Sequence, residues 1–134
     1  MWPFRRSKRS DEPLGRQGER LAEGLCKRRG MKILAANYRC PSGEVDLIAL
    51  DSSARSEQGL ETIAFIEVKT RTSDRYTSPE SAVGPDKQRR IRRAARYYLA
   101  HRDTEGYLAR FDIVAIVLSD GGEPQLTYIE NAFV

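Results

Sequence analysis

Cysteine and histidine are scarce in this 134-residue sequence, which contains two cysteines and a single histidine. Two cysteines cannot supply a four-cysteine zinc site, and one histidine excludes any mechanism that needs a histidine pair. We therefore expect Cys26 and Cys40 to be small buried or half-buried apolar residues rather than ligands or a disulfide. His101 follows a helical run of charged residues, so a surface position is expected for it.

Long apolar runs are absent as well, since no segment approaches the ~20 residues needed to cross a bilayer. The basic segment 1–12 lacks the apolar core of a secretion signal. These features predict a cytoplasmic protein with no membrane partner. We expect a disordered basic arm at residues 1–12, followed by a single domain at residues 13–134.

Positive charge is plentiful and unevenly distributed, although the net charge is only +4. Lysine and arginine cluster in "FRRSKR" near the start, in "CKRRG" at residues 26–30 and in "DKQRRIRRAARYY" at residues 86–98. Such clusters are typical of proteins that bind polyanions. A solvated face without a partner gives the same pattern, so both interpretations stay open.

Hydrophobic periodicity predicts one helix, three strands, a second helix and two further strands. The first helix is expected to end at Gly30 in a left-handed conformation, and the apolar strand at residues 110–120 is expected to be central. The order predicts an α/β fold with an α-β-β-β-α-β core, a mixed sheet flanked by helices. The expected helices span residues 13–30 and 86–102, and the expected strands span residues 31–40, 44–51, 60–71, 110–120 and 125–133.

Charged residues interrupt two of the apolar strands. In "FIEVKTR", strand alternation places Glu67 and Lys69 on one face with Phe65. In "EVDLIALD", the same alternation places Asp46 on the face of Ile48. A buried carboxylate needs a partner. A salt bridge to Lys69 is one explanation, but a single lysine would then serve two acids, whereas a divalent cation satisfies both.

A cation site of this kind predicts hydrolysis of a phosphodiester. Mg²⁺ or Mn²⁺ would be bound by the carboxylates of Asp46 and Glu67, with the backbone carbonyl of Val68 as a third ligand. Lys69 beside them could orient the attacking water and stabilise negative charge in the transition state, or act as a base.

Two further charged residues are candidates for the same site. Glu19 lies on the first helix beside the small residues Gly15, Gly18 and Ala22, which would let the helix approach the sheet. Lys87 precedes Ile91 by one turn, so it is expected on the inner face of the second helix. An ordinary solvent-facing charge explains Glu19 equally well, and a snorkelling side chain explains Lys87.

Three blocks of the sequence resemble the bacterial YraN family, which is grouped with the PD-(D/E)XK nuclease superfamily. They are "GRQGERLAEGLCKRRGMKILAANYRCPSGEVDLIALD", "IAFIEVKTR" and "RFDIVAIV", and together they span most of residues 14–118. The resemblance implies a restriction-endonuclease-like core similar to that of archaeal-type Holliday-junction resolvases. It also implies that Asp46 and Glu67 bind metal, that Lys69 is catalytic and that Glu19 is the helix glutamate. Val45 stands where the superfamily signature has proline.

The leading hypothesis is a Mg²⁺- or Mn²⁺-dependent DNA endonuclease, with branched or structured DNA among its expected substrates and DNA favoured over RNA. Two alternatives stay open: a nucleic-acid-binding module without useful activity, and a dimeric assembly subunit. A homodimer is compatible with all three. The residues expected to contact phosphates are Arg71, Arg75, Lys87, Arg89, Arg90, Arg92 and Arg93.

Overall fold

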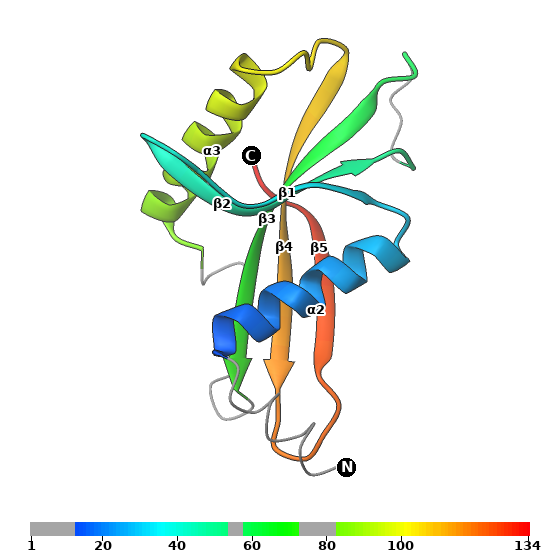
Figure 1. Ribbon diagram of the computed structural model, residues 1–134, viewed down its shortest axis with the longest axis vertical. Helices are drawn as coiled ribbons and strands as arrows, with labels where there is room; N and C mark the ends of the chain where they lie inside the picture. The colour runs from blue at the N-terminus through cyan, green and yellow to red at the C-terminus, as the bar shows by residue number, and fades with distance from the viewer. Residues whose placement is uncertain (1–12, 54–57, 73–82) are drawn as a thin grey trace.

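The computed structural model describes residues 13–53, 58–72 and 83–134. It confirms the predicted order of elements and the α/β class (Figure 1). The elements are α2 (Leu14–Arg28), β1 (Lys32–Cys40), β2 (Gly43–Asp51), β3 (Glu61–Thr72), α3 (Pro85–Ala100), β4 (Tyr107–Leu118) and β5 (Gln125–Phe133).

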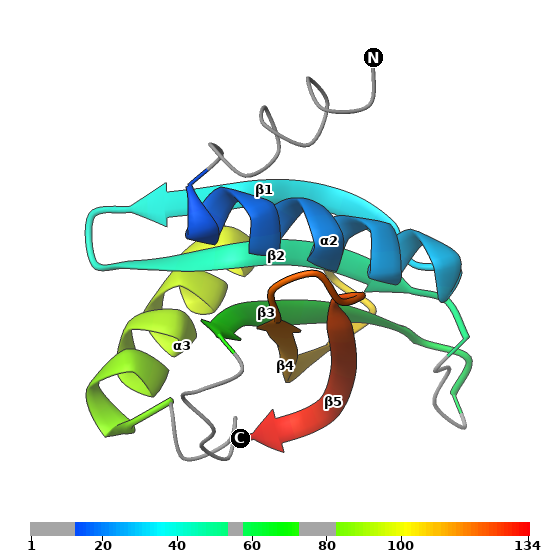
Figure 2. The same cartoon turned by 90° about the horizontal axis from the view of Figure 1, so that it is seen from below.

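The five strands form one mixed sheet in the order β1-β2-β3-β4-β5. Three of the four neighbouring pairs are antiparallel, and only β3 and β4 run parallel. Two parallel neighbours cannot be joined by a tight turn, so the chain between them crosses over through α3. The strands fan apart through a strong twist, with β3 in the middle of the sheet (Figures 1 and 2).

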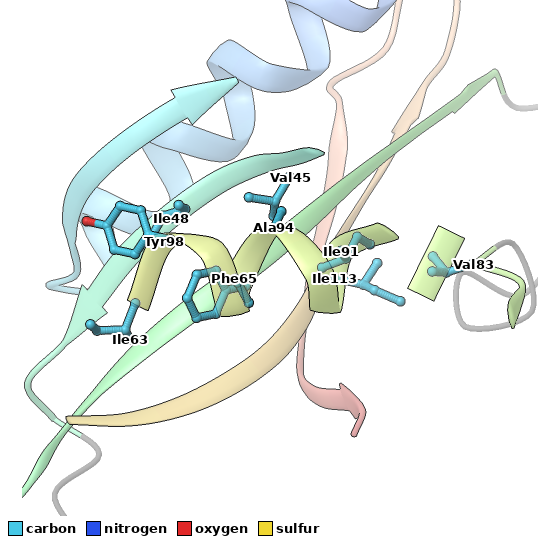
Figure 3. Packing of buried hydrophobic residues seen from close by; sticks show 10 residues of the cluster. Val45, Ile48, Ile63, Phe65, Val83, Ile91, Ala94, Tyr98 and Ile113 are labelled. Atoms are coloured by element: carbon cyan, nitrogen blue, oxygen red, sulfur yellow. The ribbon is translucent and has the colours of Figure 1, made fainter. Parts of the chain in front are cut away.

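Each face of the sheet carries its own hydrophobic cluster and its own helix. On one face, Phe65 of β3 packs with Ile91 and Tyr98 of α3 (Figure 3). On the other face, the next residue, Ile66, belongs to a cluster with Cys26 of α2. Successive strand residues point to opposite faces, so α2 and α3 cover the two sides of β3.

Glycines allow α2 to end and to pack as the sequence predicts. Gly30 has a φ of +81°, the left-handed conformation expected after the helix. Gly18 faces Thr70 of β3 so closely that a Cβ atom added at position 18 would overlap the Thr70 side chain. The first helix therefore lies against the strand that carries Glu67 and Lys69.

The scarce residues have the structural roles expected of them. Cys26 is buried, Cys40 is half-buried, and both are free thiols. His101 is exposed; its ring stacks on Tyr97, and its Nδ1 atom lies 2.8 Å from the Tyr97 carbonyl oxygen. Within the described ranges, no helix is long and apolar enough to span a membrane. The predicted basic arm at residues 1–12 lies outside those ranges.

One buried polar group interrupts β4, which the sequence predicts as a continuous apolar strand. Asp112 is completely buried. Its carboxylate accepts hydrogen bonds from Arg110, from the Tyr128 hydroxyl and from the Asn131 backbone N–H. Arg110 also donates to Asp51 at 3.0 Å. The network ties β2, β4 and β5 together, and none of the predicted catalytic residues is among these hydrogen-bond partners.

Candidate active site

The site begins where β2 and β3 stop pairing. Their last paired residues in this direction are Leu47 and Ile66, and continuing the register by one residue places Asp46 opposite Glu67. The Val68 backbone N–H donates a hydrogen bond to Asp46 Oδ2 at 2.8 Å. The Asp46 carboxyl group thus accepts a hydrogen bond that a backbone carbonyl would accept in regular strand pairing.

The regular alternation of β2 does not extend through Asp46, contrary to the sequence prediction. Val45 packs in the cluster on the α3 face, as Ile48 does, whereas Leu47 packs on the α2 face. Opposite Asp46 on β1, Asn37 has a left-handed backbone with a φ of +52°. Because of this irregularity, the half-buried Asp46 does not lie on the apolar face predicted for it.

Glu67 is the most deeply buried acid of the group, with 3% of its surface exposed. Its Oε2 atom lies 3.5 Å from Lys69 Nζ and 3.6 Å from Lys87 Nζ. Its Oε1 atom is buried and has no hydrogen-bond partner in the part of the chain that the structure describes. Burial, together with the charge of Asp46, raises the pKa of Glu67 to about 7, although Lys87 and Lys69 lower it.

These residues surround a pocket of about 300 Å³ between the start of α2 and the ends of β2 and β3. Four of the predicted residues form part of its wall: Asp46 from β2, and Glu67, Lys69 and Arg71 from β3. Glu19 of α2 lines it too. The structure therefore brings together all four candidate catalytic residues and Val68, which also lines the pocket.

The Glu19 carboxyl group is hydrogen-bonded to Asn37, which lies opposite Asp46. The Asn37 side-chain amide donates to Glu19 Oε1 at 3.3 Å. Because Asn37 lies on β1 opposite Asp46, this contact places the helix glutamate at the same break in the sheet. The close packing of Gly18 against Thr70 brings the first turns of α2 near enough for this contact.

The remaining basic candidates are distributed along α3. Arg89 pairs with Asp86, Arg90 NH1 lies 3.8 Å from Glu44, and Arg92 donates to the Val134 carbonyl at 3.1 Å. Arg93 is exposed. Arg75 lies outside the described residues.

The donor set suits a hard divalent cation only if substrate or water completes the shell. Over residues 13–53, 58–72 and 83–134, no three side chains of histidine, cysteine, aspartate or glutamate converge as a metal cage. Two carboxylates with a free buried oxygen are nevertheless the usual protein contribution to a Mg²⁺ site that binds a phosphate. Asp46 and Glu67 fit this description, and Val68 is positioned at the same pocket wall.

The sequence reasoning missed Glu44, which lies two residues before Asp46 in "GEVD". Its Oε1 atom lies 3.6 Å from Lys87 Nζ, so Lys87 is shared between Glu44 and Glu67. A glutamate at the start of a strand next to a turn resembles any surface charge. No pattern in one sequence distinguishes it.

Comparisons with known proteins agree on one family. The model of the uncharacterised protein family UPF0102 matches residues 18–116. A UPF0102 protein of Syntrophus aciditrophicus is 43% identical over 119 residues, which cover 89% of this chain and 87% of that protein. A UPF0102 protein of Geobacter metallireducens is 43% identical over 123 residues, 92% and 93% of the two chains. One from Mycolicibacterium gilvum is 38% identical over 118 residues, 88% and 91% of the two chains. The matched segment contains Glu19, Asp46, Glu67 and Lys69, and the chain belongs to the UPF0102 family, the YraN-like proteins that the sequence resembles.

Proposed function

We propose that this chain is a Mg²⁺- or Mn²⁺-dependent endonuclease that hydrolyses phosphodiester bonds in DNA. The proposal includes the restriction-endonuclease-like placement in the PD-(D/E)XK superfamily. The observation that carries it is the close pair of acids Asp46 and Glu67: they are near enough to share a proton, and when both are charged the buried Glu67 Oε1 atom has no hydrogen-bond donor among the described residues. An unsatisfied buried carboxylate oxygen is costly, and a bound cation would remove that cost.

Asp46 and Glu67 would hold the cation, with the Val68 carbonyl as a third oxygen ligand. When bound, the cation would neutralise charge on the phosphate and make a coordinated water more acidic. The Val68 N–H keeps the Asp46 carboxylate fixed at the pocket wall. Hydrolysis requires that a water oxygen bonds to phosphorus and that one phosphorus–oxygen ester bond breaks.

Among the described residues, Lys69 is well placed to act on the reacting phosphate. It is 24% exposed, lines the pocket and lies 3.5 Å from Glu67 Oε2. Its ammonium group can donate hydrogen bonds to a phosphate oxygen and stabilise the charge that develops there. Arg71, at the same pocket, can contact a neighbouring phosphate.

The exposed basic residues of α3 favour a polyanion such as DNA as the class of substrate. Arg89, Arg90 and Arg93 are exposed on one helix, and on binding a phosphate backbone they would release the counterions condensed on it. The described residues present no element shaped for reading bases in a groove, so we expect binding without sequence preference. Branched and other structured DNA are included because the sequence resembles a family similar to archaeal-type Holliday-junction resolvases.

The test is a cleavage panel on linear duplex, single strand, flap and four-way junction, each with Mg²⁺, Mn²⁺ or EDTA. Wild type is compared with Asp46→Asn, Lys69→Met and the distant control Glu130→Gln. We expect cutting that requires the metal, survives in the control and is lost in both site variants. Binding without cutting on every substrate would instead support a nucleic-acid-binding module that lacks activity.

A further inference from the structure

The Lys87 ammonium group is shared equally between two carboxylates from different strands. Its Nζ atom lies 3.6 Å from Glu44 Oε1 on β2 and 3.6 Å from Glu67 Oε2 on β3. The side chain of Lys87 is only 23% exposed, whereas the exposed fraction of Glu44 is 39%. Lys87 therefore forms a bridge from the half-exposed Glu44 to the buried Glu67.

The two lysines on Glu67 occupy different surroundings. Lys69 lines the pocket beside Asp46, whereas Lys87 contacts Glu67 from α3 and does not form part of the described pocket wall. Lys69 is thus placed to meet a phosphate, and Lys87 is placed to act on the Glu67 carboxylate. Lys87 is also predicted to contact nucleic acid, which stays a prediction; within the protein, the structure pairs it with Glu44 and Glu67.

A close backbone contact between β2 and α3 brings Glu44 near Lys87. Gly43 lies against the Arg90 carbonyl of α3 so closely that a Cβ atom at position 43 would overlap it. Glu44 follows directly, and Lys87 lies about one turn before Arg90 on the same helix. The start of β2 therefore lies next to the first turns of α3, and this packing of the backbone places Glu44 beside Lys87.

We infer that Glu44 is a positioning residue that acts through Lys87: it holds the Lys87 ammonium group between two carboxylates, so that Glu67 stays oriented by Lys87 yet remains available to a cation. This inference rests on the proposed metal-dependent function. Without Glu44, Lys87 would pair with Glu67 alone, and that pairing would compete directly with a divalent cation. Arg39 and Arg90, each 3.8 Å from Glu44, help to keep its carboxylate at the bridge.

A double-mutant cycle with Mn²⁺ binding by calorimetry tests the inference. Glu44→Gln should weaken Mn²⁺ binding about tenfold, the lower end of the effect of losing a partner that orients a metal ligand. In a Lys87→Met background the same change should alter the affinity by less than about threefold, because residues that act in one chain are not additive. In a Lys87→Arg background the full effect of Glu44→Gln should return.

Matched controls separate this coupling from general charge and stability effects. Glu130→Gln removes a glutamate of similar exposure, 49%, which pairs with Arg29 beyond the opposite end of α2, so Mn²⁺ affinity should not change. Arg89→Met removes an exposed cation two residues from Lys87. Arg89 pairs with Asp86, so this control should also leave the Mn²⁺ affinity unchanged. An equal loss from Glu44→Gln in the wild-type and Lys87→Met backgrounds would mean that Glu44 acts through its own charge, and would overturn the inference.

A metal-free measurement distinguishes failure of this inference from failure of the proposed function. The carboxyl ¹³C resonance of Glu67 should shift in Glu44→Gln and should not respond to the same change when Lys87 is already methionine. Wild-type protein that binds no Mn²⁺ would contradict the proposed function, and the resonance would still decide whether Glu44 positions Glu67. A resonance that ignores Glu44→Gln would overturn the inference whatever the metal result.

Discussion

Asp46 of β2 accepts a hydrogen bond from the Val68 backbone of β3 at 2.8 Å, so a carboxylate replaces strand pairing at the point where the two strands separate. A side chain that satisfies a backbone N–H in this way is fixed without being neutralised by a cation. The Asp46 side chain is therefore held next to the buried carboxyl group of Glu67, whose pKa it raises. In the absence of metal, a second negative charge on Glu67 beside Asp46 is therefore costly.

The stability of the metal-free protein should decrease as pH rises from about 4.5 to above 7. Burial and Asp46 raise the pKa of Glu67 from 4.5 to about 7, so folding favours its protonated form. That contribution is complete below the unfolded pKa and is lost as pH rises through about 7, a difference on the order of 2 kcal/mol. Urea unfolding at pH 5 and pH 8 measures it.

The control for this pH effect is Glu67→Gln, which should show a smaller decrease in stability between the same two pH values because the titrating group is gone. Mn²⁺ should reduce the decrease in the wild type by favouring the charged carboxylate. Identical pH dependence in wild type and Glu67→Gln would show that Glu67 titrates normally.

Glu19→Gln should slow cleavage about tenfold while leaving the fold intact, a smaller effect than loss of Asp46. Glu19 lines the pocket, and the hydrogen bond that it accepts from Asn37 orients its carboxyl group there. Single-turnover cleavage rates measure the effect. Glu23→Gln, one turn further along α2, is the matched control, and an equal loss in both variants would remove Glu19 from the site.

Gly18→Ala should lower the free energy of unfolding by about 1–3 kcal/mol, because the new Cβ atom overlaps Thr70 and pushes α2 away from β3. Gly15→Ala on the same helix meets nothing within 4 Å, so it should be neutral or stabilising by up to about 1 kcal/mol. Chemical denaturation of both variants gives the comparison. A neutral Gly18→Ala would mean that α2 is not held closely by that contact.

Asp112→Asn should destabilise the protein by up to about 5 kcal/mol, because Arg110 loses the charge of its completely buried partner and keeps Asp51 as its other acidic partner. Tyr128→Phe removes one hydrogen bond to the same carboxylate and should cost about 1–2 kcal/mol. Thermal unfolding followed by circular dichroism measures both. If Asp112→Asn cost less than Tyr128→Phe, the network would not be the anchor of β4 and β5.

The fold could be predicted largely because helix and strand periodicities differ and because Gly30 marks the end of a helix. The acids could be predicted because Glu67 and Asp46 stand among apolar residues. Lys69 and Lys87 could be named as candidates because one shares a strand face with Glu67 and the other lies on the inner face of the second helix. Glu44 could not, since its place beside Lys87 depends on a close approach of Gly43 to α3. Asp112 was hidden for the same reason: its partners Tyr128 and Asn131 come from a strand that pairs beside it only after folding.

The most direct test is anomalous diffraction from crystals soaked in Mn²⁺. The account predicts a manganese peak bonded to carboxylate oxygens of both Asp46 and Glu67, with Glu67 Oε1 among its ligands. A peak bound to other residues, with Glu67 contacted only by Lys69 and Lys87, would contradict it.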